Sequence, residues 1–388
     1  MKTCDVLIIG SGVIGLSAAY HLALGGIKNI DVIDKAATSG EGSTGKATGG
    51  FRAQFGSRIS VKLSLLSRKK LLTFKEETGV DPGYLQYGYL FIAKSPGELE
   101  RLHAAVKLQK DSGLAEVREV SPDEIKELNP YIEHKEIMGG SFSPTDGFIS
   151  PINILKGYTE SAKKLGVKFH YSEELTGFKL NSADKKITEV ITPRNNYSAG
   201  CVINAAGAWA GALGRLAGAD IPVVPLKRQV ACLKEKNILP ANLPMTIFTE
   251  DSFHFRMRDG ALLLLLPANN EITNPYDTTV EDGWLNKIDN ISKRLIPRLA
   301  SCSIDKQNSW AGLYEMSPDE HVLLGLAPGV ENFYLANGSS GHGVMHSPAI
   351  GQLLAEIIID GKAKTIDSHS LRPSRFIEGE PIDSIKFF

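Results

Sequence analysis

Three glycines and one acidic residue near the N-terminus have the types and spacing that suit a phosphate and a sugar. Gly10, Gly12 and Gly15 lie in the run Gly-Ser-Gly-Val-Ile-Gly, and Asp34 follows 19 residues after the last of them. The first two glycines permit a tight turn and a close approach of the backbone to phosphate oxygens, and the third permits close helix packing. A carboxylate at this interval accepts a hydrogen bond from a ribose hydroxyl. The pattern therefore predicts a dinucleotide site, without separating NAD from FAD.

The surrounding sequence supplies the elements that this site needs. The apolar run 6–9 predicts a buried strand, an apolar face after Gly15 predicts a helix, and 30–33 predicts a second strand ending in Asp34. The N-terminus of such a helix presents free N–H groups and the positive end of its dipole to an anion. The chain holds 38 glycines, so the order of strand, turn, helix, strand and acid carries the interpretation rather than the glycines alone.

Further segments of this kind lie far downstream. A buried strand over 201–206 ends at Gly207, and a block at 310–361 combines a strand at 332–336, a glycine-rich turn and a helix at 347–360. The stretch 36–58 is too rich in glycine for a regular helix. A dinucleotide unit divided in this way is typical of FAD enzymes with two interwoven domains, whereas NAD dehydrogenases keep the unit contiguous.

We therefore expect an α/β fold in which a Rossmann-like FAD-binding domain, assembled from discontinuous segments, accompanies a substrate domain with a mixed or antiparallel sheet. The expected FAD-binding segments are 1–83, 145–218 and 315–388, and the expected substrate-domain segments are 84–144 and 219–314.

Bulk properties exclude several classes of protein. The net charge of −1 gives no basic excess for nucleic acid. Four cysteines without metal-type spacing indicate reduced thiols, so no metal site is expected. The apolar runs are too short to span a membrane, and no secretory signal is recognised. A cytoplasmic location is the expectation.

Four ordered blocks resemble the D-amino-acid oxidase family of FAD enzymes, which includes glycine oxidase, sarcosine oxidases and the β subunits of dye-linked proline dehydrogenases. The blocks are 10–34, 42–52, 202–209 and 310–351, and the last contains Trp-Ala-Gly-Leu-Tyr-Glu-Met-Ser-Pro-Asp and Gly-Ser-Ser-Gly-His-Gly. Tyr314 within it is more similar to the sarcosine oxidase β and proline dehydrogenase β subunits than to glycine oxidases, which carry arginine there.

The resemblance implies that FAD is the cofactor and assigns residues to it. The pyrophosphate, the adenosine and the flavin ring are each expected to contact several backbone segments. The expected cofactor-binding residues are Gly10, Gly12, Val13, Ile14, Gly15, Asp34, Lys35, Gly42, Ser43, Thr44, Gly49, Gly50, Leu175, Ala205, Ala206, Gly207, Trp209, Gly312, Gly338, Gly341, His342, Gly343, Val344 and Met345. Gly312 stands where monomeric sarcosine oxidases carry the cysteine that links FAD, so non-covalent FAD is expected. Met345 replaces a lysine that anchors their substrate carboxylate.

Four residues are candidates for a catalytic role, through contact with the substrate or the flavin. Arg52 matches the family's carboxylate-binding arginine, and a planar guanidinium suits a bidentate carboxylate. Arg256 is either a second anchor or a solvated strand residue, and Tyr314 either reaches the substrate or only packs. His342 is expected to contact the flavin through its backbone. His254 alternates with two phenylalanines, which favours a surface position over a catalytic one.

These features predict an FAD-dependent oxidoreductase that converts the C–N bond of a small amino or secondary amino acid, of the sarcosine, proline or glycine type, to an imine. One alternative is oxidation of a hydroxy acid or polyol phosphate. Others are an FAD-bearing subunit active only within a hetero-oligomer, and an NAD dehydrogenase. The sequence leaves open whether oxygen, a quinone or dye, or a partner subunit accepts the electrons.

Overall fold

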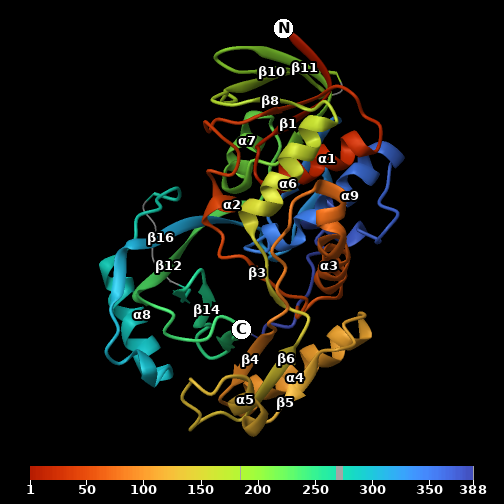
Figure 1. Cartoon of the computed structure of the whole chain (residues 1–388). Helices are drawn as coiled ribbons and strands as arrows, with labels where there is room; N and C mark the ends of the chain where they lie inside the picture. Colours follow the sequence, from red (N-terminus) through yellow and green to blue (C-terminus); the bar gives the residue numbers. More distant parts are fainter. Residues whose placement is uncertain (184, 268–273, 388) are drawn as a thin grey trace.

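The computed structural model describes residues 1–183, 185–267 and 274–387, and it contains two large sheets joined by helices and glycine-rich turns. In Figure 1 the first sheet and helices α1, α6 and α9 occupy the upper part of the molecule, and much of the second sheet lies below them. The helices are α1 (Val13–Leu24), α2 (Ser43–Lys46), α3 (Arg58–Thr78), α4 (Pro96–Asp111), α5 (Pro122–Leu128), α6 (Pro151–Lys164), α7 (Ala210–Leu216), α8 (Asp282–Leu295) and α9 (Gly343–Asp360).

The first sheet has a parallel centre. Its strands run in the order β17 (Leu323–Leu326), β18 (Phe333–Asn337), β11 (Asn196–Asn204), β1 (Lys2–Ile9), β2 (Ile30–Ile33) and β8 (Lys168–His170), with β10 (Ile187–Ile191) and β9 (Gly177–Leu180) attached to β11. β1 pairs in parallel with β11 and β2, and β11 pairs in parallel with β18. Val6, Leu7 and Ile8 are all buried, as expected where both faces of a parallel sheet are covered.

The second sheet is antiparallel except where β13 and β4 run in parallel. Its order is β16 (Ile304–Met316), β12 (Val224–Lys236), β15 (Ala261–Leu265), β14 (His254–Arg258), β13 (Met245–Phe248), β4 (Tyr89–Ala93), β6 (Gly139–Ser143) and β5 (Arg118–Val120). A short ribbon of β3 (Gly50–Phe51) and β7 (Gly147–Phe148) lies apart from both large sheets. The predicted fold class is confirmed: a Rossmann-like parallel sheet accompanies a mixed antiparallel sheet, although the strands of each come from distant parts of the chain.

Helices α1 and α9 run side by side in the same direction. A Cβ atom on Gly343 would lie 3.3 Å from Ile14 Cδ1, and one on Gly25 would lie 2.4 Å from Ile359 Cδ1. Between these ends a Cβ on Gly351 would lie 2.2 Å from Ser17 Oγ, which is closer than atoms approach in real structures. Glycine at 351 thus lets the two helices approach closely, and their N-termini lie together.

The structure corrects two expected boundaries. The glycine-rich stretch 36–58 contains the short helix α2, and α9 begins at Gly343 rather than at Ser347. Pro348 therefore lies inside α9, where it has no N–H for the carbonyl of Val344. The hydroxyl of Ser347 donates to that carbonyl over 2.9 Å, so the helix continues through the proline.

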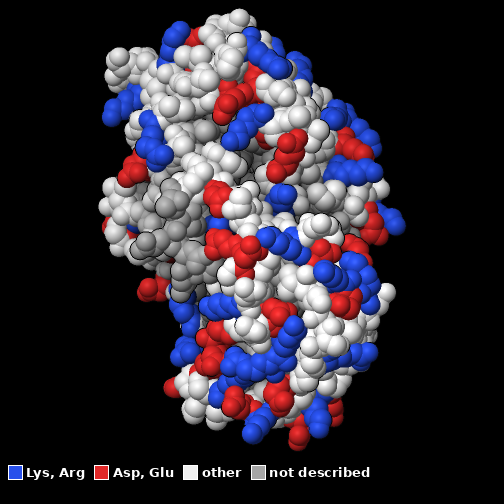
Figure 2. Space-filling model, turned by 90° about the vertical axis from the view of Figure 1, so that its left-hand side faces the viewer, with Lys and Arg blue, Asp and Glu red and all other residues white. Residues whose placement is uncertain are grey.

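The surface and the helices add two observations. On the face shown in Figure 2, basic and acidic side chains are interspersed, in keeping with the near-zero net charge. Within the described ranges, no helix is both long and apolar enough to cross a membrane.

A buried ion pair fixes the C-terminal segment. Arg375, which has no exposed side-chain area, donates through Nε and Nη2 to the two carboxylate oxygens of Asp319 over 2.8 and 2.9 Å. The same carboxylate accepts the backbone N–H of Ile382 over 3.0 Å. Asp319 thereby ties the last turn before β17 to the segment that follows α9.

We expect Arg375→Met to destabilise the protein by about 3–5 kcal/mol, because it leaves the Asp319 carboxylate buried without its cation. Urea unfolding monitored by circular dichroism measures this free energy. Arg298→Met is the matched control, since Arg298 is exposed and makes no ion pair among the described residues. Equal stabilities of Arg375→Met and Arg298→Met would contradict the structural importance of the pair.

Candidate active site

A cavity of about 990 Å³ lies between the two sheets, and segments from the whole length of the chain line it. One end is formed by the turns after β1, β2 and β11, and the other by strands of the second sheet and the C-terminal segment. Its size lies at the upper end of the range typical of small-molecule sites. The middle is lined by the stretch 40–50 and the turn at 339–345.

The turn after β1 is shaped by contacts that exclude side chains. Gly10 has a φ of 110°, and a Cβ atom there would lie 2.4 Å from the carbonyl oxygen of Ala205. A Cβ on Gly15 would lie 2.1 Å from the Gly10 carbonyl oxygen, so Gly15 lets α1 begin directly against the turn. Gly10 and Gly12 line the cavity, whereas Gly15 acts through packing and does not.

The Asp34 carboxylate is fixed at the mouth of this turn. Its Oδ2 accepts the backbone N–H and the hydroxyl of Ser11 over 2.6 and 2.7 Å, and its Oδ1 accepts the backbone N–H of Ala36 over 2.8 Å. Oδ1 has a second lone pair, so Asp34 can still accept a hydroxyl from the cavity. Nearby, the Lys35 ammonium lies 3.7 Å from the centroid of the Trp209 ring, which stacks on Tyr276.

Two helices direct their N-termini into the cavity. Gly12 precedes α1 and His342 precedes α9; in the described chain neither of these two residues caps its helix through a side chain, and neither helix has an acidic residue in its first turn. The hydroxyl of Thr44 accepts the N–H of Val13 over 3.1 Å. Parallel helices with adjacent N-termini place two partial positive charges close together, and these charges repel each other. An anion bound between them offsets this repulsion.

Arg52 lies buried at the far end of the cavity. Its Nη2 donates to His342 Nε2 over 3.2 Å, its Nη1 donates to the carbonyl of Gln54, and the guanidinium lies 3.8 Å from the centroid of the Phe55 ring. Burial lowers the pKa of Arg52 to about 10, which still leaves it charged at neutral pH. Burial and the Arg52 charge hold the pKa of His342 well below its usual range, so its imidazole is neutral and accepts this hydrogen bond.

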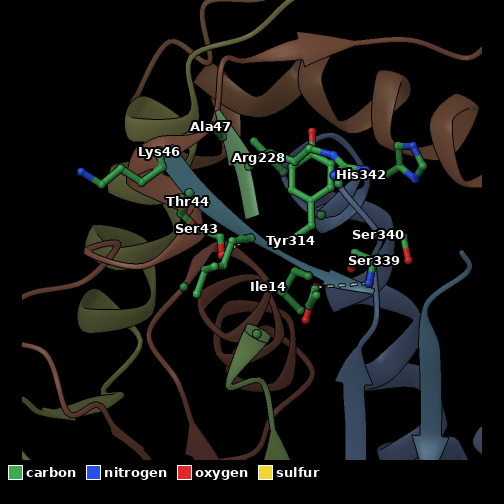
Figure 3. A pocket seen from close by; sticks show the side chains of 18 of the residues that line it. Ile14, Ser43, Thr44, Lys46, Ala47, Arg228, Tyr314, Ser339, Ser340 and His342 are labelled. Carbon is green, nitrogen blue, oxygen red and sulfur yellow. Dashed lines mark hydrogen bonds between the residues drawn. The ribbon is translucent and has the colours of Figure 1, made fainter. Parts of the chain in front are cut away.

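Arg228 and Tyr314 form the opposite wall. The Arg228 guanidinium carbon lies 5.5 Å from the centroid of the Tyr314 ring, and Figure 3 shows the two side chains beside each other near His342. A Cβ on Gly341 would lie 2.3 Å from the Tyr314 ring, so the glycine leaves room for the tyrosine. Across residues 1–183, 185–267 and 274–387, Arg228 has no acidic partner within ion-pair distance.

His254 lies in the same wall, which corrects the expected surface position. Its neighbours Phe253 and Phe255 point into the core of the second sheet, so alternation along β14 turns His254 toward the cavity. Burial lowers its pKa to about 4, and its Nδ1 lies 2.8 Å from the carbonyl oxygen of Ser252. The neutral imidazole therefore adds a polar group without a charge.

Arg256 does not line the cavity, and it is not solvated either. Its guanidinium is buried 3.7 Å from the centroid of the Phe148 ring. It donates through Nη1 to the carbonyls of Thr48 and Gly49 over 2.7 and 3.0 Å, and through Nε to that of Met257 over 3.1 Å. The solvated alternative is therefore wrong, and although Arg256 lies on the same face of β14 as His254, its guanidinium is taken up by backbone carbonyls. It positions the 48–49 backbone at the cavity.

Glu315 is a buried acid beside the turn that precedes α9. Its Oε1 accepts the N–H of Ser339 over 3.3 Å, while its Oε2 has no hydrogen-bond partner in the described structure. Burial raises the pKa of this carboxyl to about 7. Ser339 Oγ also lacks a partner and lines the cavity.

Most residues proposed from the sequence line this one cavity. Of the expected cofactor-binding set, Gly15 and Gly338 are outside the lining, and Gly338 instead shapes the turn after β18 with a φ of 78°. Sequence reasoning missed Arg228 and Glu315 and favoured core packing for Tyr89, which is buried and yet borders the cavity. The described residues include no cluster of three or more histidine, cysteine or acidic side chains suited to a metal ion.

A parallel sheet with a glycine turn, a second sheet and a cavity touching both define a dinucleotide-binding enzyme with a separate substrate wall. The family model described as FAD dependent oxidoreductase (DAO) matches residues 5–357, so the chain belongs to the DAO family of FAD-dependent oxidoreductases. The resemblance identified from the four sequence blocks is confirmed.

Individual relatives are similar over almost the whole chain. The "FAD-dependent oxidoreductase domain-containing protein 1" of Xenopus laevis is 29% identical, with 98% of this chain and 84% of that protein covered. Human mitochondrial dimethylglycine dehydrogenase is 27% identical over 96% of this chain, which spans 44% of that protein. The crystal structure of L-proline dehydrogenase from P. horikoshii is 28% identical and has a TM-score of 0.89, covering 98% of this chain and 100% of that chain.

FAD is the cofactor of this family, and the observed cavity fits it. The N-terminus of α1, which has no acidic residue in its first turn, suits a pyrophosphate, and that of α9 suits the flavin edge that gains negative charge on reduction. The unpartnered hydroxyl of Ser339 offers a further hydrogen bond on the α9 side. The fixed carboxylate of Asp34 has the chemistry to accept a ribose hydroxyl.

We expect Glu315→Gln to change how stability depends on pH. Because the folded protein raises the pKa of Glu315 above its unfolded value, the native state binds more protons between pH 4.5 and about 7. Its contribution to stability is therefore lost as the pH rises through this window, by about 1–3 kcal/mol in total.

The melting temperature of the holoprotein measured from pH 5 to pH 8 tests this expectation. The melting temperature of Glu315→Gln should rise relative to that of wild type as the pH rises. The histidines titrate in both proteins, so their contributions cancel in the difference between the two melting temperatures. Glu331→Gln, at an exposed site, serves as the control. A difference that does not change with pH would show that Glu315 titrates normally.

Proposed function

We propose that this protein oxidises the C–N bond of a small amino or secondary amino acid, of the sarcosine, proline or glycine type, to an imine. FAD, when bound, supplies the hydride acceptor at N5 of its flavin ring. The protein's own residues bind the substrate carboxylate, orient the C–H bond and exclude water. The observation that carries the proposal is the cationic, aromatic-lined end of the cavity, beside the turn that leads into α9.

Arg228 is the principal candidate for the carboxylate anchor. It borders the cavity, and burial lowers its pKa, which indicates a guanidinium partly removed from water. No acidic side chain of the described residues pairs with it, so a substrate carboxylate is the partner that its chemistry favours. Arg52 contributes a second positive charge from the opposite wall, oriented by Phe55 and His342.

The uncharged groups of the site suit hydride transfer from a neutral amine. His342 and His254 both have pKa values lowered by burial, and the neighbouring arginines lower them further, so neither carries a charge at neutral pH. The Tyr314 hydroxyl remains protonated because burial raises its pKa. An environment of positive charge and neutral imidazoles disfavours an ammonium group and so favours the neutral, reactive amine.

The names of relatives support the same class of substrate. An L-proline dehydrogenase and a dimethylglycine dehydrogenase act on secondary and tertiary amino acids, as their names state. Because this chain spans under half of the dimethylglycine dehydrogenase, the comparison extends only to the shared part.

Three further expectations are retained as proposals. FAD is bound non-covalently, which is supported by Gly312 in the lining and by the position of all four cysteines outside it. The FAD-binding segments 1–83, 145–218 and 315–388 and the substrate segments 84–144 and 219–314 follow the two sheets; residues 184, 268–273 and 388 of these ranges lie outside the described part. The electron acceptor is oxygen, a quinone or dye, or a partner subunit in a hetero-oligomer.

An anaerobic substrate screen tests the proposal. Sarcosine, proline, glycine and dimethylglycine are mixed with the holoprotein, and bleaching of the flavin band is followed by stopped flow against lactate and glycerol 3-phosphate. We expect bleaching by at least one amine and none by the hydroxy compounds. Reduction by lactate or glycerol 3-phosphate alone would contradict the proposal.

For the amine that bleaches the flavin, Arg228→Met should raise the substrate concentration that gives half-maximal flavin reduction by about 10- to 100-fold, since the variant lacks a charge-assisted hydrogen bond. Arg215→Met is the matched control, because Arg215 is exposed and outside the cavity lining. An unchanged half-saturation in Arg228→Met would remove Arg228 from the carboxylate site.

A further inference from the structure

The last described residues of the chain form part of the cavity wall at its substrate end. Ser384, Ile385, Lys386 and Phe387 all border the cavity. They follow the 3-10 helix Pro373–Phe376. In Figure 1 the last part of the described chain approaches β4 and β14 of the second sheet. This part of the cavity wall is therefore formed by a segment that lies outside the four sequence blocks shared with the family.

Several contacts hold the segment in place. The N–H of Ile385 donates to the carbonyl of Gly56 over 2.9 Å. A Cβ atom on Gly56 would lie only 2.0 Å from the Ile385 carbonyl oxygen, so the segment crosses directly over this glycine. Lys386 forms an ion pair with Glu320, and Ile382 is bound to Asp319 upstream. The stretch that carries Arg52 and the C-terminal segment thus lie against each other.

Phe387 has the largest apolar side chain among these four residues. Its side chain is 3% exposed, and its ring centroid lies 5.2 Å from that of Phe91 in an edge-to-face arrangement. It belongs to an apolar cluster with Tyr89, Met245 and Ile247, all of which also line the cavity. The ring therefore occupies space that borders the place where a substrate side chain would extend from a carboxylate held by the arginines.

We propose that Phe387 is a specificity-determining residue that limits the substrate to amino acids with small side chains. This inference rests on the proposed function, because it takes the arginine end of the cavity as the carboxylate site. Apolar contact with Phe387 favours a compact aliphatic group, and its ring excludes a larger one by overlap. Ile385 and Gly56 fix the backbone so that the ring does not swing away.

Binding of inert carboxylates to the oxidised holoprotein measures this limit without turnover. Acetate and cyclohexanecarboxylate are titrated, and the shift of the flavin absorbance band gives each dissociation constant. For wild type we expect acetate to bind at least about tenfold more tightly. Phe387→Ala should improve cyclohexanecarboxylate binding by about tenfold or more and leave acetate within about twofold. Phe387→Leu should fall between the two.

Ile377→Ala is the matched control, because Ile377 lies in the same C-terminal region but is 74% exposed and outside the lining. It should behave as wild type. Flavin content and melting temperature identify any variant that fails to fold. If Phe387→Ala fails to fold, Phe387→Leu, which keeps an apolar side chain, is used in its place.

The outcomes separate this inference from the function on which it rests. If acetate binds but the preference between the two carboxylates is the same in wild type and in the Phe387 variants, the proposed role of Phe387 is wrong and the carboxylate site stands. If wild type binds both carboxylates equally, the size limit is likewise wrong. If neither carboxylate shifts the flavin absorbance band of wild type or of any variant, the proposed carboxylate site is wrong, and the proposed role of Phe387 is wrong as well.

Discussion

The parallel approach of α1 and α9 is the constraint on which the rest of the site depends. Two helices from opposite ends of the chain can lie this close because Gly351 leaves room for Ser17. Their N-termini then face one cavity, and neither helix has an acidic residue in its first turn in the described chain. Such a pair of positive helix ends favours a bound anion, which suits a charged dinucleotide at this position.

The rest of the cavity follows from the second sheet. Strands β12 and β16 pair so that Arg228 lies opposite Gly312, and Tyr314 follows two residues later on the same face. The absence of a side chain at 341 leaves space for Tyr314, the absence of one at 312 leaves space for Lys46, and β14 adds His254. The chain thus surrounds the reacting region with two arginines and neutral hydrogen-bonding groups, and it requires no acid–base pair to orient an amine for hydride transfer.

Local patterns predicted the N-terminal turn, its helix and the Gly-His-Gly turn, because glycine positions and hydrophobic periodicity are properties of neighbouring residues. They failed at Arg228 and His254, whose position depends on which face of a strand meets the cavity. Arg256 lies on the same face of β14 as His254, but its guanidinium donates to the backbone carbonyls at 48–49, a contact between distant segments that no local pattern predicts. No local signal placed Phe387 at the cavity, since its neighbours Ile385 and Lys386 are held by the distant residues Gly56 and Glu320.

A crystal structure of the holoprotein soaked with acetate tests the central claim most directly. The account predicts the FAD pyrophosphate at the N-terminus of α1, the flavin ring beside residues 341–345, and acetate within hydrogen-bond distance of Arg228. A flavin ring remote from the N-terminus of α9 would contradict the claim that the two helix ends form one cofactor site. So would acetate bound away from both Arg228 and Arg52.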